Sequence, residues 1–272
     1  MKLLILSDIH SNVYALEAIW ARESDCDAIY CVGDLVDYGP FPKETIRWCR
    51  EHHVRSVIGN HDQRLIQIYN QLNGDVSGIA PEDYCWVHDN CSLLDREDVA
   101  YLESLPEILD FTADGYYYRF SHQFAPKYGR PQSIHQFDEF VYRNPPERTD
   151  LPFRLIFGHS HRQAICQFRG EKLWMNPGSA SYRRPDDQEK SAHYAVIENG
   201  LIDLRAVEYD RTPLLQRTVD LALSGKLQEA ELRVAFFFFG SAPSTETSVS
   251  DSIRQSMEQL KKGGQYEVTP KS

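Results

Sequence analysis

The sequence lacks paired cysteines, an excess of positive charge and long hydrophobic runs. Its six cysteines form no CxxC pair or other zinc spacing, so we do not expect a structural zinc. We expect the cysteines to be reduced thiols in a cytosolic protein. With 29 Lys+Arg against 40 Asp+Glu, the net charge of −11 disfavours non-specific binding to nucleic acid or anionic membranes. A small anionic substrate is not excluded, because bound metal ions reverse the sign of the local charge.

The hydrophobic runs are too short for a signal peptide or a membrane span. Only four strongly apolar residues follow Lys2 before Asp8 is reached, and the run 234–239 is far shorter than a bilayer requires. The chain of 272 residues, 42% hydrophobic and 25% charged, has the composition of an ordinary globular domain. We expect a cytoplasmic protein without a membrane partner, and the sequence leaves open whether it forms a homo-oligomer.

Hydrophobic runs alternate with helical patterns at the start of the chain. Apolar runs at 3–6, 28–32 and 54–58 predict buried strands, and amphipathic segments from Val13 and Pro42 predict the helices between them. Strands joined by helices through short links are typical of a parallel sheet with right-handed crossovers. The sequence therefore predicts an α/β fold whose ligand site lies at the carboxyl ends of the strands.

The rest of the chain predicts further strands and three helical regions. Residues 63–106 are helical and more polar, and form either a peripheral insert or a lid. Strands are expected at 116–120, 154–157, 164–168, 172–175, 193–197 and 202–209, the last two joined by a hairpin turn at Asn199-Gly200. Helices are expected over 213–239, and 241–272 form a flexible tail or a late helix. We expect a single domain over residues 1–240 that contains the first two helical regions.

Polar side chains follow five of the predicted strands. They are Asp8 and His10, Asp34 and Asp37, Asn60 and His61, His122, and His159 and His161. Any one of these groups alone is most often an ordinary turn or hydrogen bond, but five strand ends that all carry nitrogen or oxygen ligands are hard to obtain by accident. A set of His, Asp and Asn without thiolate suits Mn²⁺, Fe or Zn²⁺. The pattern therefore predicts a metal site at the edge of the sheet.

The order of these motifs, DxH, GDxxD, GNHD, H and GHxH, resembles the calcineurin-like metallophosphoesterase superfamily. The resemblance spans about residues 1–210, and the NPGS segment after GHSH is similar to the small bacterial and archaeal phosphodiesterases of that superfamily. It implies a four-layer αββα sandwich with two mixed β-sheets. It also implies a dinuclear metal site at the carboxyl ends of the strands.

The resemblance further implies a role for each motif residue. The ligands would be Asp8, His10 and His161 for the first metal ion, Asn60, His122 and His159 for the second, and Asp34 as the bridge. Two divalent ions are implied, with Mn²⁺ the first expectation and Fe or Zn²⁺ the alternatives, and the reaction would be in-line attack at phosphorus by a hydroxide that bridges them. His61 resembles the general acid of the family, and Asp37 would orient it.

Departures from the family motifs bear on the substrate. The protein Ser/Thr phosphatases read GDxVDRG and GNHE, whereas here Tyr38 stands at the arginine position and Asp62 follows GNH. A phosphoprotein substrate is therefore not expected. His122 is followed by Gln instead of the Gly often seen in this branch. Arg64 and Arg183 lie near motif segments and could hold phosphate oxygens bidentately, and Tyr38 is the third predicted substrate-binding residue.

We expect metal-dependent hydrolysis of a small, nucleotide-like phosphoester, as a phosphodiesterase or phosphohydrolase. One alternative is a dinucleoside polyphosphate hydrolase specifically. Another is a non-catalytic interaction scaffold, because this fold also occurs in a subunit of a protein-sorting complex. In such scaffolds the metal ligands have normally been lost, whereas here every ligand position is filled. A DNA nuclease of the superfamily is disfavoured by the negative net charge and the lack of a basic stripe.

Overall fold

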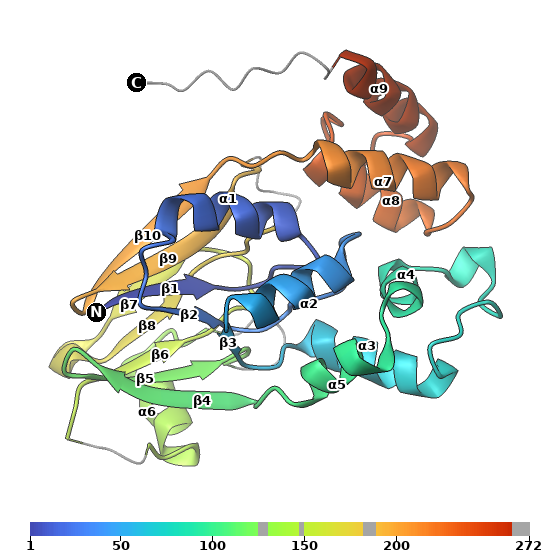
Figure 1. The fold of residues 1–272 in the computed structure, drawn as a ribbon. Coiled ribbons are helices and arrows are strands. Elements are labelled where there is room, and N and C mark those ends of the chain that lie inside the picture. Colours follow the sequence, from blue (N-terminus) through green and yellow to red (C-terminus); the bar gives the residue numbers. More distant parts are fainter. Residues whose placement is uncertain (125–129, 147–149, 182–188, 263–272) are drawn as a thin grey trace.

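Two five-stranded β-sheets face each other in the computed structural model, which describes residues 1–124, 130–146, 150–181 and 189–262 (Figure 1). Across the first sheet lie, in order, β10 (Leu201–Val207), β9 (Ala192–Glu198), β1 (Lys2–Leu6), β2 (Ala28–Cys31) and β3 (Arg55–Ser56). Across the second lie β4 (Ile108–Ala113), β5 (Tyr116–Ser121), β6 (Phe153–Ile156), β8 (Leu173–Asn176) and β7 (Ala164–Gln167).

Both sheets mix parallel and antiparallel pairs, as predicted. In the first sheet β1, β2 and β3 are parallel, whereas β9 is antiparallel to both β1 and β10. The turn between β9 and β10 holds Asn199 and Gly200 at φ 50° and 78°, a left-handed pair that the Asn-Gly sequence favours. In the second sheet, parallel β5, β6 and β8 lie between the antiparallel edge strands β4 and β7.

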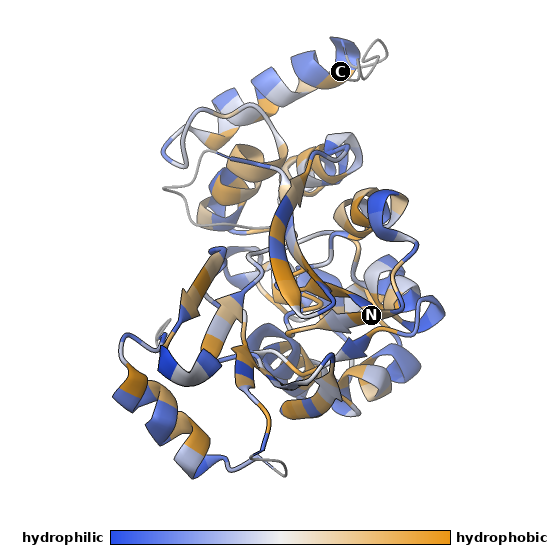
Figure 2. Ribbon diagram, turned by 90° about the vertical axis from the view of Figure 1, so that its left-hand side faces the viewer, coloured by the Kyte–Doolittle hydropathy of each residue, from blue (hydrophilic) through white to orange (hydrophobic). Residues whose placement is uncertain are grey.

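Helices cover the outer face of each sheet. α1 (Val13–Glu23) and α2 (Pro42–Glu51) pack on the first sheet, and α6 (Ile134–Arg143) packs on the second, on the opposite side of the molecule (Figure 1). Hydrophobic and hydrophilic residues alternate along α6, and its buried Phe137 packs with Phe153 and Leu155 of β6 (Figure 2). The predicted four-layer αββα sandwich is confirmed.

Strand β1 shows why the first apolar run has no polar face. Leu3 and Ile5 belong to the core between the sheets, whereas Leu4 and Leu6 pack in the core that contains α1 and α2. All four side chains have 0% exposure, as expected of a central strand that is covered on both sides. Burial of each contributes roughly 1.5–3 kcal/mol. The packing of β1 on both faces therefore fixes the position of the polar residues that follow Leu6.

Two groups of helices adjoin the sandwich. The first comprises α3 (Asn60–Leu72), the 3₁₀ turn η1 (Pro81–Asp83), α4 (Trp86–Leu93) and α5 (Arg96–Glu103), and the second comprises α7 (Thr212–Leu223), α8 (Glu229–Phe239) and α9 (Val249–Lys262). Tyr84 and Trp86 pack into the hydrophobic core of the second group, so the two groups are in contact. A second 3₁₀ turn, η2 (Arg169–Glu171), links β7 to β8. Within the described ranges, no helix has the length and apolar character needed to cross a bilayer.

Three local features differ from the sequence expectation. β4 was not predicted, although its inward residues Leu109, Phe111 and Ala113 alternate with more exposed ones, the pattern of an edge strand. β3 contains only two paired residues of the predicted run 54–58. α3 begins at Asn60 and not at 63, so Asn60 and its neighbour lie in the first turn of a helix.

Candidate metal centre

The five predicted strand-end clusters converge at one end of the sandwich. β1, β2 and β3 end at Leu6, Cys31 and Ser56 in one sheet, and β5 and β6 end at Ser121 and Ile156 in the other. The segments that follow these strands carry all the predicted metal ligands, and contacts across the gap between the sheets bring them together. The edges of both sheets therefore build one site.

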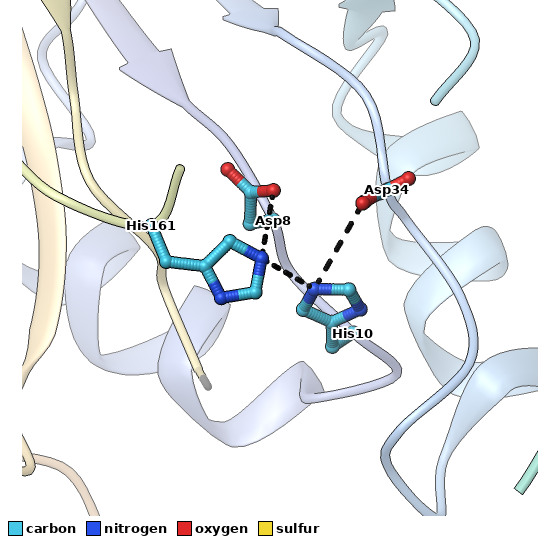
Figure 3. A group of neighbouring side chains, drawn as sticks. All are labelled: Asp8, His10, Asp34 and His161. Atoms are coloured by element: carbon cyan, nitrogen blue, oxygen red, sulfur yellow. Dashed lines mark hydrogen bonds and ion pairs between the residues drawn. The ribbon is translucent and has the colours of Figure 1, made fainter. Parts of the chain in front are cut away.

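The first group of side chains comes from both sheets (Figure 3). Nε2 of His161 lies 3.2 Å from Oδ1 of Asp8 and 3.2 Å from Nε2 of His10. Nε2 of His10 is in turn 4.0 Å from Oδ2 of Asp34. One ligand atom from each of the four residues lies within 4.8 Å of the others, so the group could hold one metal ion.

The second group is centred on the side-chain amide of Asn60. Its Oδ1 lies 2.9 Å from Nε2 of His122 and 2.8 Å from Nδ1 of His159. Nε2 of His122 is also 3.1 Å from Oδ2 of Asp34, and Asp34, His122 and His159 again lie close enough to hold an ion. Asp34 is thus shared by both groups, and it is the residue that the sequence predicts as the bridge.

The carboxylate of Asp34 fits a shared cation. Its Oδ1 accepts a hydrogen bond of 2.9 Å from the backbone N–H of His61. Its Oδ2 is buried and, among the described residues, has no hydrogen-bond partner, although Nε2 of His122 faces it. A buried carboxylate oxygen without a donor is costly unless a cation compensates it. The donor set around Oδ2, which is nitrogen and oxygen without thiolate, suits a divalent ion.

The protonation states of the site residues also fit a divalent metal ion. Burial is the largest influence on Asp34 and opposes its ionisation, but His122, His61 and His10 together outweigh burial and lower the pKa of this carboxyl. Burial likewise disfavours protonation of His122, yet Asp34 raises the pKa of His122 to about 9. Burial, reinforced by neighbouring histidines, lowers the pKa of His10 to about 3 and that of His159 to about 4. Ionised carboxylates beside neutral imidazoles are the protonation states that bind divalent metals, and an ion would displace the proton of His122.

The backbone of the site is strained at its ligands. Asp8, His10, Asp34, His159 and His161 all have positive φ, between 49° and 62°. Such angles are uncommon for residues that carry a side chain, and they persist only where the surrounding structure enforces them. The concentration of this conformation at the ligands indicates a functional constraint.

Two motif glycines allow the loops to approach the carboxylates. A Cβ atom on Gly59 would collide with Oδ1 of Asp34, and one on Gly158 would collide with Oγ of Ser7 and lie 2.7 Å from Oδ2 of Asp8. The GNH and GHSH segments can therefore close on the two carboxylates only because glycine precedes their ligands.

His61 and Asp37 form a hydrogen-bonded pair beside the two groups. Nδ1 of His61 lies 2.8 Å from Oδ2 of Asp37. Burial opposes protonation of His61, but the bond to Asp37 and the charge of Asp34 outweigh it and raise the pKa of His61. The structure thus places a readily protonated imidazole next to the shared carboxylate.

Of the three predicted substrate-binding residues, two lie at the site. The ring of Tyr38 is 4.4 Å from that of His61, between ring centroids, and Nη1 of Arg64 is 3.4 Å from Oδ2 of Asp37. The Arg64 side chain is 43% exposed and so is accessible to a ligand. Arg183 lies outside the described residues.

Asp62 is a supporting residue whose role the sequence interpretation missed. Its carboxylate accepts hydrogen bonds of 2.9–3.1 Å from four backbone N–H groups, those of Gly59, Asp34, Leu35 and Val36. Asp62 is the third residue of α3, where an acidic side chain commonly caps a helix, so the GNHD spacing carried the signal. The residue ties the GD loop to the start of α3.

Asn90 is a second supporting residue that was missed. Its Oδ1 accepts hydrogen bonds from Oγ of Ser11 at 2.6 Å and from the backbone N–H of Asp37 at 2.9 Å, and its Nδ2 donates to the carbonyl of Gly39 at 2.8 Å. Asn90 is fully buried on α4, 79 residues from Ser11 in the chain. No local sequence pattern marks it, because its partners belong to distant loops.

The NPGS segment supports the loops that carry ligands. Nδ2 of Asn176 donates to the carbonyl of Gly158 at 2.7 Å and to Oγ of Ser160 at 2.9 Å. Oγ of Ser179 donates to the carbonyl of Asp8 at 2.8 Å. The motif therefore holds the GHSH loop and the end of β1 in their relative positions.

A four-layer sandwich with Asp, His and Asn side chains gathered across the ends of both sheets is the architecture of the metallophosphoesterases. A family model described as the calcineurin-like phosphoesterase superfamily domain matches residues 1–199, and the chain belongs to this family. Members of this superfamily use divalent metal ions, and the side-chain groups described above could hold such an ion.

Three individual proteins are similar to this chain over most of its length. An uncharacterized protein of Methanocaldococcus jannaschii is 28% identical over 233 residues, which cover 76% of this chain and 87% of the relative. A hypothetical protein from Pyrococcus horikoshii has the same fold, with a TM-score of 0.68, 18% identity and coverage of 89% of this chain and 99% of the other. For a metallophosphoesterase from Sphaerobacter thermophilus the TM-score is 0.61, the identity 23% and the coverage 86% and 100%.

A shorter similarity links the chain to a named enzyme. A symmetrical bis(5'-nucleosyl)-tetraphosphatase of Pectobacterium atrosepticum is 34% identical over 74 residues. The match covers 25% of this chain and only 26% of that enzyme.

Proposed function

We propose that the protein is a two-metal phosphoesterase that hydrolyses small, nucleotide-like phosphodiesters. The observation that carries the proposal is the pair of ligand groups that share the buried carboxylate of Asp34, with the His61–Asp37 pair beside them. Shared carboxylate ligation is typical of dinuclear hydrolytic sites, because one carboxylate has an oxygen for each ion.

Seven residues would hold the metals. Asp8, His10 and His161 would bind the first ion, Asn60, His122 and His159 the second, and Asp34 both. When bound, two divalent ions supply activation of water and neutralisation of charge at phosphorus, and Mn²⁺ is the first candidate, with Fe or Zn²⁺ as alternatives.

His61 would protonate the leaving oxygen. Asp37 holds its Nδ1, so Nε2 is the nitrogen that remains to donate a proton to substrate, and the raised pKa keeps that proton available near neutral pH. Arg64, which is accessible beside Asp37, would bind a phosphoryl oxygen, and Tyr38 would line the same side. Arg183 stays a predicted third binding residue.

The proposal is tested with bis-p-nitrophenyl phosphate and Mn²⁺. Asp34→Asn should abolish turnover and reduce bound metal below two ions per chain, as measured by elemental analysis. The matched control is Asp203→Asn on β10, a carboxylate of the same sheet that is exposed and paired with Arg205. Equal activity of wild type and Asp34→Asn would refute the mechanism, and less than one bound ion per wild-type chain would favour a non-catalytic scaffold.

A second candidate function is the hydrolysis of dinucleoside polyphosphates. The observation in its favour is the 34% identity over 74 residues to the symmetrical bis(5'-nucleosyl)-tetraphosphatase of Pectobacterium atrosepticum. Diadenosine tetraphosphate and bis-p-nitrophenyl phosphate should be assayed side by side, because a much higher kcat/KM for the dinucleotide would select this candidate.

We also propose that helices α3 to α5 act as a fixed support and not as a moving lid. Asn90 of α4 is buried and forms hydrogen bonds with three separate groups of the site loops. All three hydrogen bonds would be lost if α4 moved away from the site. Hydrogen exchange at α4 that is as slow as in β1 would support this proposal, and fast exchange would contradict it.

The cysteines favour a reducing compartment. All six are free, and Cys31, Cys49 and Cys91 have pKa values that burial raises, so their thiols are protonated and unreactive. We propose that the protein works in the cytoplasm, where thiols stay reduced.

A further inference from the structure

A side chain from outside the family-matched region reaches the site. Oε2 of Glu231, on α8, accepts a hydrogen bond of 2.7 Å from the backbone N–H of Trp86, the first residue of α4. The family match ends at residue 199, so Glu231 lies in the part of the chain that follows it. The C-terminal helices thereby bring a carboxylate to the start of α4.

A short chain of contacts connects that point with the proposed general acid. Sγ of Cys85, the residue before Trp86, lies 3.6 Å from Nη2 of Arg64. Nη1 of Arg64 lies 3.4 Å from Oδ2 of Asp37, which holds Nδ1 of His61 at 2.8 Å. Glu231 is therefore on the Arg64 side of the site.

Glu231 forms no ion pair with Arg64, so Arg64 does not neutralise its charge by direct contact. Its hydrogen bond is to a backbone N–H, and the ion pair of Arg64 is with Asp37. The carboxyl is partly buried and interacts electrostatically with Asp37, Arg64 and His61. A partly buried charge acts over several ångströms with little screening. Arg64 is consequently in direct contact with one carboxylate, that of Asp37, and within the electrostatic influence of a second, that of Glu231.

We propose that Glu231 is a specificity-determining residue of this site, a step that rests on the proposed phosphoesterase function. Its negative charge disfavours substrates that bring additional negative charge to the Arg64 side, such as phosphomonoesters and polyphosphates. Phosphodiesters whose flanking group is neutral or cationic are favoured. This selectivity comes from α8 and not from the motif loops.

The test compares two substrates with the same chromophore. p-Nitrophenyl phosphate carries one more negative charge than bis-p-nitrophenyl phosphate, and kcat/KM for both is measured with the Mn²⁺-loaded full chain at pH 8.5. Burial raises the pKa of Glu231 to about 7, so the carboxyl is ionised under these conditions. Glu231→Gln keeps an acceptor for the N–H of Trp86 and removes the charge. We expect the monoester-to-diester ratio of kcat/KM to rise about fivefold, the size of one Coulomb interaction across several ångströms.

Glu229→Gln is the matched control, because Glu229 lies on the same helix, is exposed and pairs with Arg233. It should leave the ratio at the wild-type value, as should the charge-preserving Glu231→Asp. Glu231→Ala serves as a second charge-free variant if the Gln variant unfolds at a lower temperature than the assay.

Each outcome has a separate meaning. An unchanged ratio in the charge-free variants, or an equal loss of kcat/KM on both substrates, overturns the role in specificity and leaves Glu231 as a cap of α4. A wild-type protein that binds two ions but hydrolyses neither substrate contradicts the proposed function itself, and this inference with it. An active wild type with the expected rise in ratio supports both.

Discussion

The two sheets contribute chemically different side chains to the site. From the ends of the first sheet come three carboxylates, one amide and two imidazoles, those of Asp8, Asp34, Asp37, Asn60, His10 and His61. From the ends of the second sheet come three imidazoles, those of His122, His159 and His161, and the amide of Gln123, which donates to Oδ1 of Asn60 at 2.9 Å. One edge of the gap is therefore strongly negative, and the other is neutral unless its histidines are protonated.

The difference explains how the gap is held together. His161 lies 3.2 Å from Asp8, and His122 lies 3.1 Å from Asp34, so these two carboxylates of the first sheet each face an imidazole of the second. A divalent ion can take the place of the proton between them and bind more tightly to the negative edge. The first sheet should then determine whether metal binds, and the second sheet should determine how well the ion bridges the two layers.

The largest expected effect comes from removing a charge from the first sheet. Asp8→Ala should lower kcat about a thousandfold and reduce the metal content by at least one ion, because the first group loses its non-shared carboxylate. Circular dichroism should be close to that of wild type, since Asp8 follows β1 and lies outside its paired residues. Full activity with full metal content would contradict the whole ligand assignment.

Removing a neutral ligand from the second sheet should matter less. His122→Ala should lower kcat about a hundredfold and leave about one ion per chain, because the carboxylates that attract the first ion stay in place. Metal analysis and kinetics on the same preparation measure both quantities. If His122→Ala lowers kcat more than Asp8→Ala does, the negative charge of the first sheet does not make its ligands the more important ones, and the proposed difference between the two sheets is wrong.

A third substitution tests the acid on the negative edge. Asp37→Asn should lower kcat about tenfold and move the alkaline limb of the pH profile to lower pH. Asp37 raises the pKa of His61, and a general acid must be protonated, so activity is lost as pH rises through that pKa. Without the carboxylate the pKa falls and the loss begins earlier. An alkaline limb that does not move would assign the proton donor to another group.

The smallest expected effect is a change in thermal stability, which tests whether the metal ion links the two sheets. Chelation should lower the melting temperature of the wild-type protein by about 5 °C, because ligands that bind only the folded state stabilise it by a few kcal/mol. Asp34→Asn should respond much less to the chelator, since its bridge is missing. Equal shifts in the two proteins would show that the stabilising ion lies elsewhere.

Much of the fold followed from local patterns. The apolar run at the start of the chain, the helices from Val13 and Pro42 and the Asn199-Gly200 turn were predicted with nearly correct limits, because each depends on residues close in sequence. β4 was missed because its half-exposed alternation begins directly after a helix and resembles a loop. α3 begins earlier than predicted because Asp62 caps it from within the GNHD motif.

The candidate site was predictable as a set of residues but not as an arrangement. Asp8, His10, Asp34, Asn60 and His61 each lie within five residues of a strand end, so their grouping needed only the strand-end rule. Their spacing to the histidines of the second sheet depends on how two sheets pack, which no local pattern encodes. Roles in catalysis stay proposals until the variants above are measured.

Local sequence specifies which side chains stand near the strand ends, because a strand and the turn after it depend on neighbouring residues. Which distant segments support these side chains depends on how the elements pack. Asn90 meets Ser11 across 79 residues, and Glu231 meets Trp86 across 145. Contacts of this range exist only after helices and sheets have packed, and the packing follows from buried apolar surface that many sequences could supply.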